Sequence, residues 1–133
     1  MPALHISPTQ MTAFEAARFE DFRALMVKHL RDTIGGPFAH QTTEALLSYI
    51  DKGVTRAKSY GATQNDAFGM FITLMTELGD DFDANSTYPW AQKTLKDTAV
   101  TDPNQRIANL GAQCSFYLSN LDNEPEQTTR SKT

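Results

Sequence analysis

Apolar residues at helical spacing, broken up by glycine and proline, constrain this chain more than any other feature of its sequence. Residues three or four positions apart share one face of a helix. The clearest such stripe comprises Ile107, Leu110, Cys114, Tyr117, Leu118 and Leu121, and a second comprises Leu46, Ile50, Val54 and Ala57. No segment shows the strict alternation of a half-buried strand. The sequence therefore predicts an all-α fold.

Residues that start and stop helices set the expected boundaries. Ser7-Pro8 is a typical opening, Gly35-Gly36-Pro37 a strong stop, and Asp102-Pro103 a second opening. Thr63 and Asp66 read as a variant capping box, in which two side chains cap the helix start. We expect a compact helical bundle of four longer helices, near residues 8–34, 43–60, 64–78 and 103–121, and one short helix near residues 89–96.

Length and composition favour a single helical domain over residues 1–121. The chain has 133 residues, enough for one modest core, and 40% of them are hydrophobic. Residues 122–133 contain no aliphatic or aromatic side chain, so they have nothing to bury in that core. We expect these last residues to form a polar flexible tail.

The charge balance, the lack of long apolar segments and the single cysteine limit the kinds of partner and compartment that we expect. The chain has 12 basic and 16 acidic side chains and a net charge of −4, without a basic stripe, which argues against a nucleic-acid partner. No apolar segment approaches the roughly 20 residues that span a bilayer, and the N-terminal residues lack the pattern of a signal peptide. With one cysteine and no intrachain disulfide, the sequence predicts a cytoplasmic protein without a membrane role.

The search for catalytic, metal and cofactor sites yields no convincing candidate. Asp81, Asp83 and Asn85 have the alternate spacing of a calcium loop, but Ser86 replaces the turn glycine and Gln92 replaces the bidentate glutamate. The three histidines are scattered and the single cysteine lies on an apolar stripe. We therefore expect no catalytic residue, metal or cofactor, and a protein that is not an enzyme.

An acidic loop that carries aromatic residues is the preferred partner-binding candidate. Aromatic side chains in loops are common anchors at interfaces, although they also pin loops onto a helical core. The proposed partner-binding residues are Tyr60, Asp80, Asp81, Phe82, Asp83, Tyr88 and Trp90.

Several short motifs between residues 53 and 95 add a family resemblance. They are Arg56-Ala57-Lys58 before Tyr60-Gly61, then Leu78-Gly79 before Phe82-Asp83, then Pro89-Trp90-Ala91. Together they resemble a family of small bacterial helical proteins whose genes lie beside type VI secretion effector and adaptor genes. The resemblance spans about residues 10–121. The opening Gln64-Asn65-Asp66 departs from the commoner Thr/Ser-Glu-x-Asp form, which bears on partner choice.

The resemblance implies a non-enzymatic accessory or co-chaperone-like protein that binds a secretion effector or its loading adaptor. An immunity protein that neutralises a co-encoded toxin is the main alternative, because an acidic protein suits a basic toxin surface. A small helical ligand-binding module is a further alternative, since bundles can enclose apolar ligands. An exposed apolar helix face would equally suit a homodimer.

Overall fold

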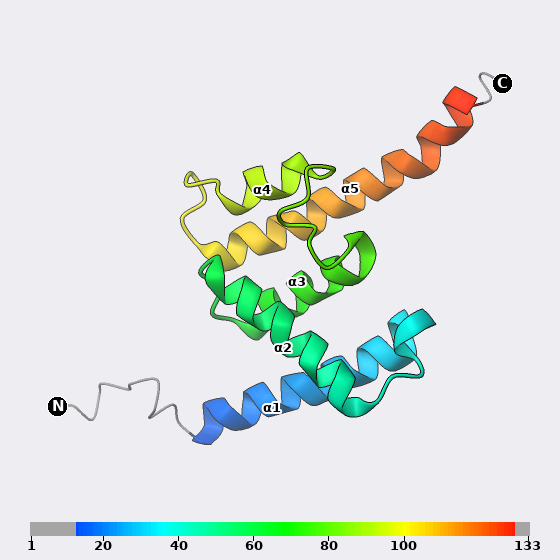
Figure 1. Ribbon diagram of the computed structural model, residues 1–133. Coiled ribbons are helices and arrows are strands. Elements are labelled where there is room, and N and C mark those ends of the chain that lie inside the picture. Colours follow the sequence, from blue (N-terminus) through cyan, green and yellow to red (C-terminus); the bar gives the residue numbers. More distant parts are fainter. Residues whose placement is uncertain (1–12, 130–133) are drawn as a thin grey trace. The chain divides into compact units, whose positions relative to one another are not determined.

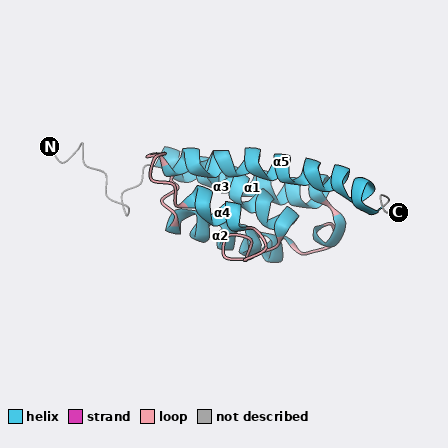
Figure 2. Cartoon of the chain, turned by 90° about the horizontal axis from the view of Figure 1, so that it is seen from above, coloured by secondary structure: helices cyan, strands magenta, loops and turns pink. Residues whose placement is uncertain are grey.

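Helices make up nearly all of the regular structure. A computed structural model describes residues 13–129, apart from the side chains of residues 14 and 121–129. Its elements are α1 (Ala13–Lys28), the π-helical turn η3 (His29–Ile34), the 3-10 turn η4 (Gly36–Phe38), α2 (Thr43–Ser59), α3 (Asn65–Leu78), α4 (Pro89–Leu95) and α5 (Pro103–Thr129) (Figure 1). Residues 13–129 contain no strand (Figure 2). The predicted all-α class, with four longer helices and one short helix, is confirmed.

The contacts of the described residues form two compact units, and the division falls within α2, between residues 52 and 53. The sequence predicts one domain over residues 1–121, and this stays a prediction. Hydrophobic spacing indicates which face of a helix is buried, but it does not indicate which other helix covers that face. The two units are described separately.

The first unit joins α1 to the start of α2 through polar contacts. The Arg23 guanidinium donates two hydrogen bonds to the Asp51 carboxylate, at 3.0 and 2.8 Å. Arg31 donates to the carbonyl oxygen of Gln41 at 3.0 Å. The buried apolar residues of this unit are Met26, Val27, Leu30, Leu46 and Ile50.

The end of the first helix differs in detail from the expected one. The last turn widens to a π-helix, in which the Gly35 N–H donates to the Leu30 carbonyl oxygen at 2.9 Å. Gly35 and Gly36 have φ angles of +64° and +55°, so the predicted stop is confirmed. The predicted start at Ser7-Pro8 lies outside the described residues. Leu25 on α1 is 66% exposed.

The second unit is built on α5, which contacts both α3 and α4. Its largest fully buried side chains are Phe71, Phe82, Ile72, Leu74, Met75, Ile107, Leu110 and Cys114. Gly111 lets α5 approach α3, because a Cβ there would lie 2.6 Å from Met70 Cε. Gly53 likewise lets α2 approach α3, because a Cβ at this position would lie 2.5 Å from Ile72 Cγ1.

The start of α3 is capped by a residue distant in sequence. The Asn104 side-chain oxygen accepts hydrogen bonds from the N–H groups of Thr63 and Gln64, at 2.9 and 3.1 Å. Gln64 occupies the N-cap position without a side-chain capping bond, and the Thr63 hydroxyl oxygen accepts from the Asn104 side-chain amide, so the predicted capping box is wrong. The Asp102-Pro103 opening of α5 is confirmed, and Asp102 Oδ1 accepts from the Asn104 N–H at 2.9 Å.

The last helix is longer than the sequence suggests. Its backbone is helical to Thr129, where a flexible tail was expected from residue 122. A segment without apolar residues is expected to make no contacts with the core. A helix that has already formed can still be extended through it, one hydrogen bond per residue. Residues 130–133 lie outside the described residues. Among the helices of the described chain, none combines the length and apolarity needed to cross a bilayer.

Candidate functional site

The predicted binding residues centre on the acidic loop, residues 79–88, between α3 and α4. Gly79 ends α3 with a φ angle of +113°, and its N–H donates to the Met75 carbonyl oxygen at 3.0 Å. Successive turns follow, in which the N–H groups of Phe82 and Tyr88 donate to the carbonyl oxygens of Gly79 and Asn85. The loop therefore has a defined path of its own.

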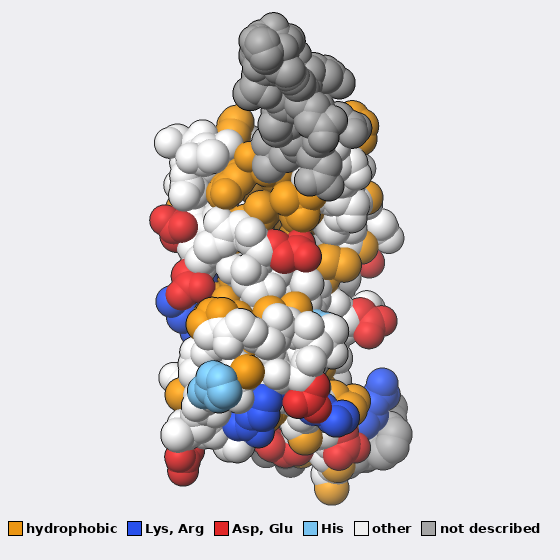
Figure 3. All heavy atoms as spheres, turned by 90° about the vertical axis from the view of Figure 1, so that its right-hand side faces the viewer, with side chains coloured by type: hydrophobic (Ala, Val, Ile, Leu, Met, Phe, Trp, Pro, Cys, Tyr) orange, Lys and Arg blue, Asp and Glu red, His pale blue; other side chains and the backbone are white. Residues whose placement is uncertain are grey.

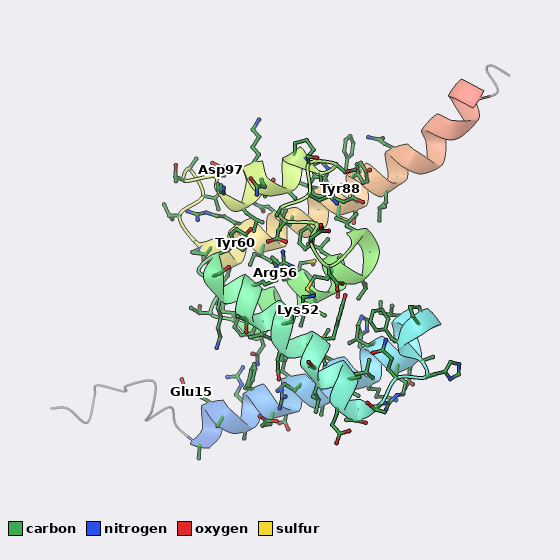
Figure 4. All side chains as sticks on the ribbon, viewed as in Figure 1. Glu15, Lys52, Arg56, Tyr60, Tyr88 and Asp97 are labelled. Carbon is green, nitrogen blue, oxygen red and sulfur yellow. The ribbon has the colours of Figure 1, made fainter. Side chains whose placement is uncertain are left out.

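A buried carboxylate ties this loop to α2. Asp83 is only 4% exposed and accepts hydrogen bonds from the Arg56 guanidinium and from the Tyr60 hydroxyl, the latter at 2.7 Å. Arg56 also donates to the carbonyl oxygen of Asp80. Arg56 lies in the last turn of α2, and Tyr60 directly follows that helix (Figure 4). We call Arg56, Tyr60 and Asp83 the Asp83 cluster.

The loop is also fixed by an aromatic contact in the core. The Phe82 ring is fully buried, and its centroid lies 5.0 Å from that of Phe71. The Tyr60 and Phe71 centroids lie 6.1 Å apart, and desolvation raises the pKa of the Tyr60 phenol. Tyr60, Phe82 and Asp83 thus hold the loop in place, and a partner does not reach Phe82 or Asp83 in this conformation.

The exposed part of the predicted site consists of the Asp80 and Asp81 residues and of an aromatic group. Tyr88, Trp90 and Tyr117 contact one another with ring centroids 5.6–6.1 Å apart. All three residues are half-buried. In Figure 3 hydrophobic side chains gather where the grey C-terminal atoms begin. We call Tyr88, Trp90 and Tyr117 the aromatic surface.

One polar atom of the aromatic surface lacks a partner. The Trp90 indole Nε1 is inaccessible to solvent and, within residues 13–129, has no hydrogen-bond acceptor. A buried donor without an acceptor costs about 1–3 kcal/mol.

The geometry also bears on the calcium-like loop and on the single cysteine. Both oxygens of the Asp83 carboxylate are engaged by Arg56 and Tyr60, which removes the central ligand of the calcium-like spacing. Within the described part of the chain, no three His, Cys, Asp or Glu side chains are grouped to hold a metal ion. Cys114 is buried, and desolvation together with the nearby Glu77 carboxylate raises its pKa to about 12. That thiol is a poor nucleophile.

Two residues of this region were missed by reasoning from the sequence. Arg56 is the main donor to the loop, and its signal was its position one turn before Tyr60 at the end of a helix followed by an acidic segment. Tyr117 completes the aromatic surface, and its signal was its place on the last apolar stripe.

No family model, curated protein or solved structure matches this chain. The basis for a functional proposal is therefore the geometry of the acidic loop and the aromatic surface, together with the family resemblance of the sequence motifs.

Proposed function

We propose that the chain is a non-enzymatic protein that binds another protein through its aromatic surface. The observation that carries this proposal is the contact of Tyr88, Trp90 and Tyr117, three residues whose rings support one another and which are not fully buried. Tyr and Trp are enriched among the residues that dominate binding energy, because they bury a large area at a low cost in conformational entropy.

The family resemblance supplies the identity of the proposed partner. It implies a type VI secretion effector or the adaptor that loads it, with the present chain as a co-chaperone that acts in the cytoplasm. The Asp83 cluster supports this role indirectly, since it fixes the loop that leads into Tyr88 and so limits the conformational freedom lost on binding.

The test is the affinity of the purified chain for effectors and adaptors encoded by neighbouring genes, measured by titration calorimetry. Trp90→Ala should weaken binding by about 30-fold, the size of a typical hot spot. The matched control is Phe116→Ala, which removes a ring that is 67% exposed on α5 next to Tyr117. Circular dichroism and urea unfolding must show that both variants stay folded.

Equal affinities of the Trp90 and Phe116 variants would contradict the proposed surface. Failure of every neighbouring effector and adaptor to bind the folded chain would contradict the proposed partner class.

An immunity role is the second candidate, and the exposed Asp80 and Asp81 residues favour it. Exposed carboxylates on a chain of net charge −4 would complement a basic toxin surface. Deletion of the gene distinguishes the two roles. Loss of an immunity protein harms the producing cell, whereas loss of a co-chaperone reduces effector delivery and leaves the producer healthy.

A further inference from the structure

A separate hollow lies where the first turns of α3 and α5 meet. Its volume is about 260 Å³, and it is lined by residues from the start of each helix. Three of the lining side chains are apolar: Ala67, Met70 and Ala108. Met70 is only half-buried, so its flexible thioether is available to adapt to an incoming group.

The polar lining of the hollow is acidic. Asp66 and Asp102 both line it, and no Lys, Arg or His does. Asp102 Oδ1 accepts from the backbone N–H and the side-chain amide of Asn104, at 2.9 and 3.1 Å. Within residues 13–129, no hydrogen bond is formed by Asp102 Oδ2 or by the Asp66 carboxylate. Two carboxylates thus retain free acceptor capacity beside an apolar wall.

We propose that this hollow receives one basic side chain of a partner protein. The aliphatic stem lies against Ala67, Met70 and Ala108, and the cationic head group pairs with Asp66 and Asp102. A neutral side chain would leave the two carboxylates unused, and an anion would be repelled by them. The hollow shares no residue with the aromatic surface, so this inference does not depend on the function proposed above.

Two small cations and a neutral analogue test the hollow in the full-length chain. Pentylammonium represents a lysine side chain, butylguanidinium represents an arginine side chain, and pentanol has the stem of the first without its charge. Amide NMR spectra recorded during titration should show saturable shifts confined to the residues around the hollow for at least one cation. Pentanol should produce much smaller shifts at the same concentrations.

Three variants separate the hollow from general attraction to an acidic protein. Asp66 is exposed, so Asp66→Asn should weaken cation binding about threefold, as expected for one surface ion pair. Glu44→Gln removes the same charge from the first turn of α2 and should leave binding unchanged. Ala108→Leu keeps both carboxylates but fills the hollow, and it should abolish the localised shifts.

Three results would overturn the proposal. The first is the absence of saturable shifts with either cation. The second is an Ala108→Leu variant, folded by circular dichroism, that binds as the natural chain does. The third is equal binding of pentanol and pentylammonium, because it would show that the carboxylates do not contribute.

Discussion

Asp83 is buried with two donors, Arg56 from the last turn of α2 and Tyr60 just after it. Removing a partner from a buried ion pair leaves a charge without compensation. Arg56→Met should therefore lower the free energy of unfolding by about 2 kcal/mol, less than the roughly 3–5 of fully enclosed pairs, because Arg56 is partly exposed.

Tyr60→Phe is the graded comparison for that variant. It removes one hydrogen bond to Asp83 but keeps the ring beside Phe71, so it should cost only about 1 kcal/mol. Urea unfolding followed by circular dichroism measures both variants. A larger loss for Tyr60→Phe than for Arg56→Met would show that Arg56 is not the main partner of Asp83.

Cys114 gives a prediction that depends on pH. Burial and Glu77 raise the pKa of this thiol from 9.0 to about 12, so the folded state disfavours the thiolate. Iodoacetamide at pH 8 should alkylate the chain in urea but not the native protein. The stability that follows from the raised pKa is complete below pH 9 and is lost as the pH rises toward 12. Rapid alkylation of the native protein would show that the thiol is exposed or its pKa is normal.

At the scale of the helices, two glycines permit close packing against different kinds of neighbour. A Cβ at Gly53 meets Ile72, a buried β-branched residue with little freedom to move. Gly53→Ala should therefore cost about 1 kcal/mol, since overpacking outweighs the gain of about 1 kcal/mol in helix propensity. Thermal unfolding and urea unfolding both measure this effect.

Gly111→Ala is the control for that prediction. The Cβ at Gly111 meets only the flexible end of Met70, which can move aside. This variant should be neutral or more stable than the natural chain. If both alanine variants are equally destabilised, the rigidity of the neighbouring side chain is not what decides the cost.

The helices of the second unit were largely predictable, because local punctuation decides where they begin and end. Pro89 and Pro103 open α4 and α5, and Gly79 ends α3. The start of α3 was not predictable in the same way. Its cap comes from Asn104, about forty residues away, and only the folded chain brings that side chain to the turn.

The candidate site was predicted in part, for a similar reason. Sequence reasoning selected the loop and its aromatic residues, but it could not divide them into those that face the core and those that face solvent. Phe82 and Asp83 are buried by partners on α3 and α2, and Trp90 gains Tyr117 from α5. A partner-binding role for the predicted residues stays a prediction.

At the scale of the whole molecule, the net charge of −4 should govern how fast partners arrive. For a basic partner, raising the salt from about 50 to about 500 mM should slow association several-fold, because the Debye length shortens. Dissociation should change much less. Surface plasmon resonance at several salt concentrations measures both rates, and an association rate independent of salt would argue against an acidic binding face.

Trp90 is the only tryptophan of the chain, and it lies between two tyrosines at the proposed interface. The protein therefore carries its single indole fluorophore at the proposed interface. Its emission reports solvent access to that ring, and excitation of Tyr88 and Tyr117 transfers energy to it over these short distances. Docking of a partner on the aromatic surface should thus change the emission spectrum of the unlabelled protein, which makes binding visible in a cuvette without any engineered probe.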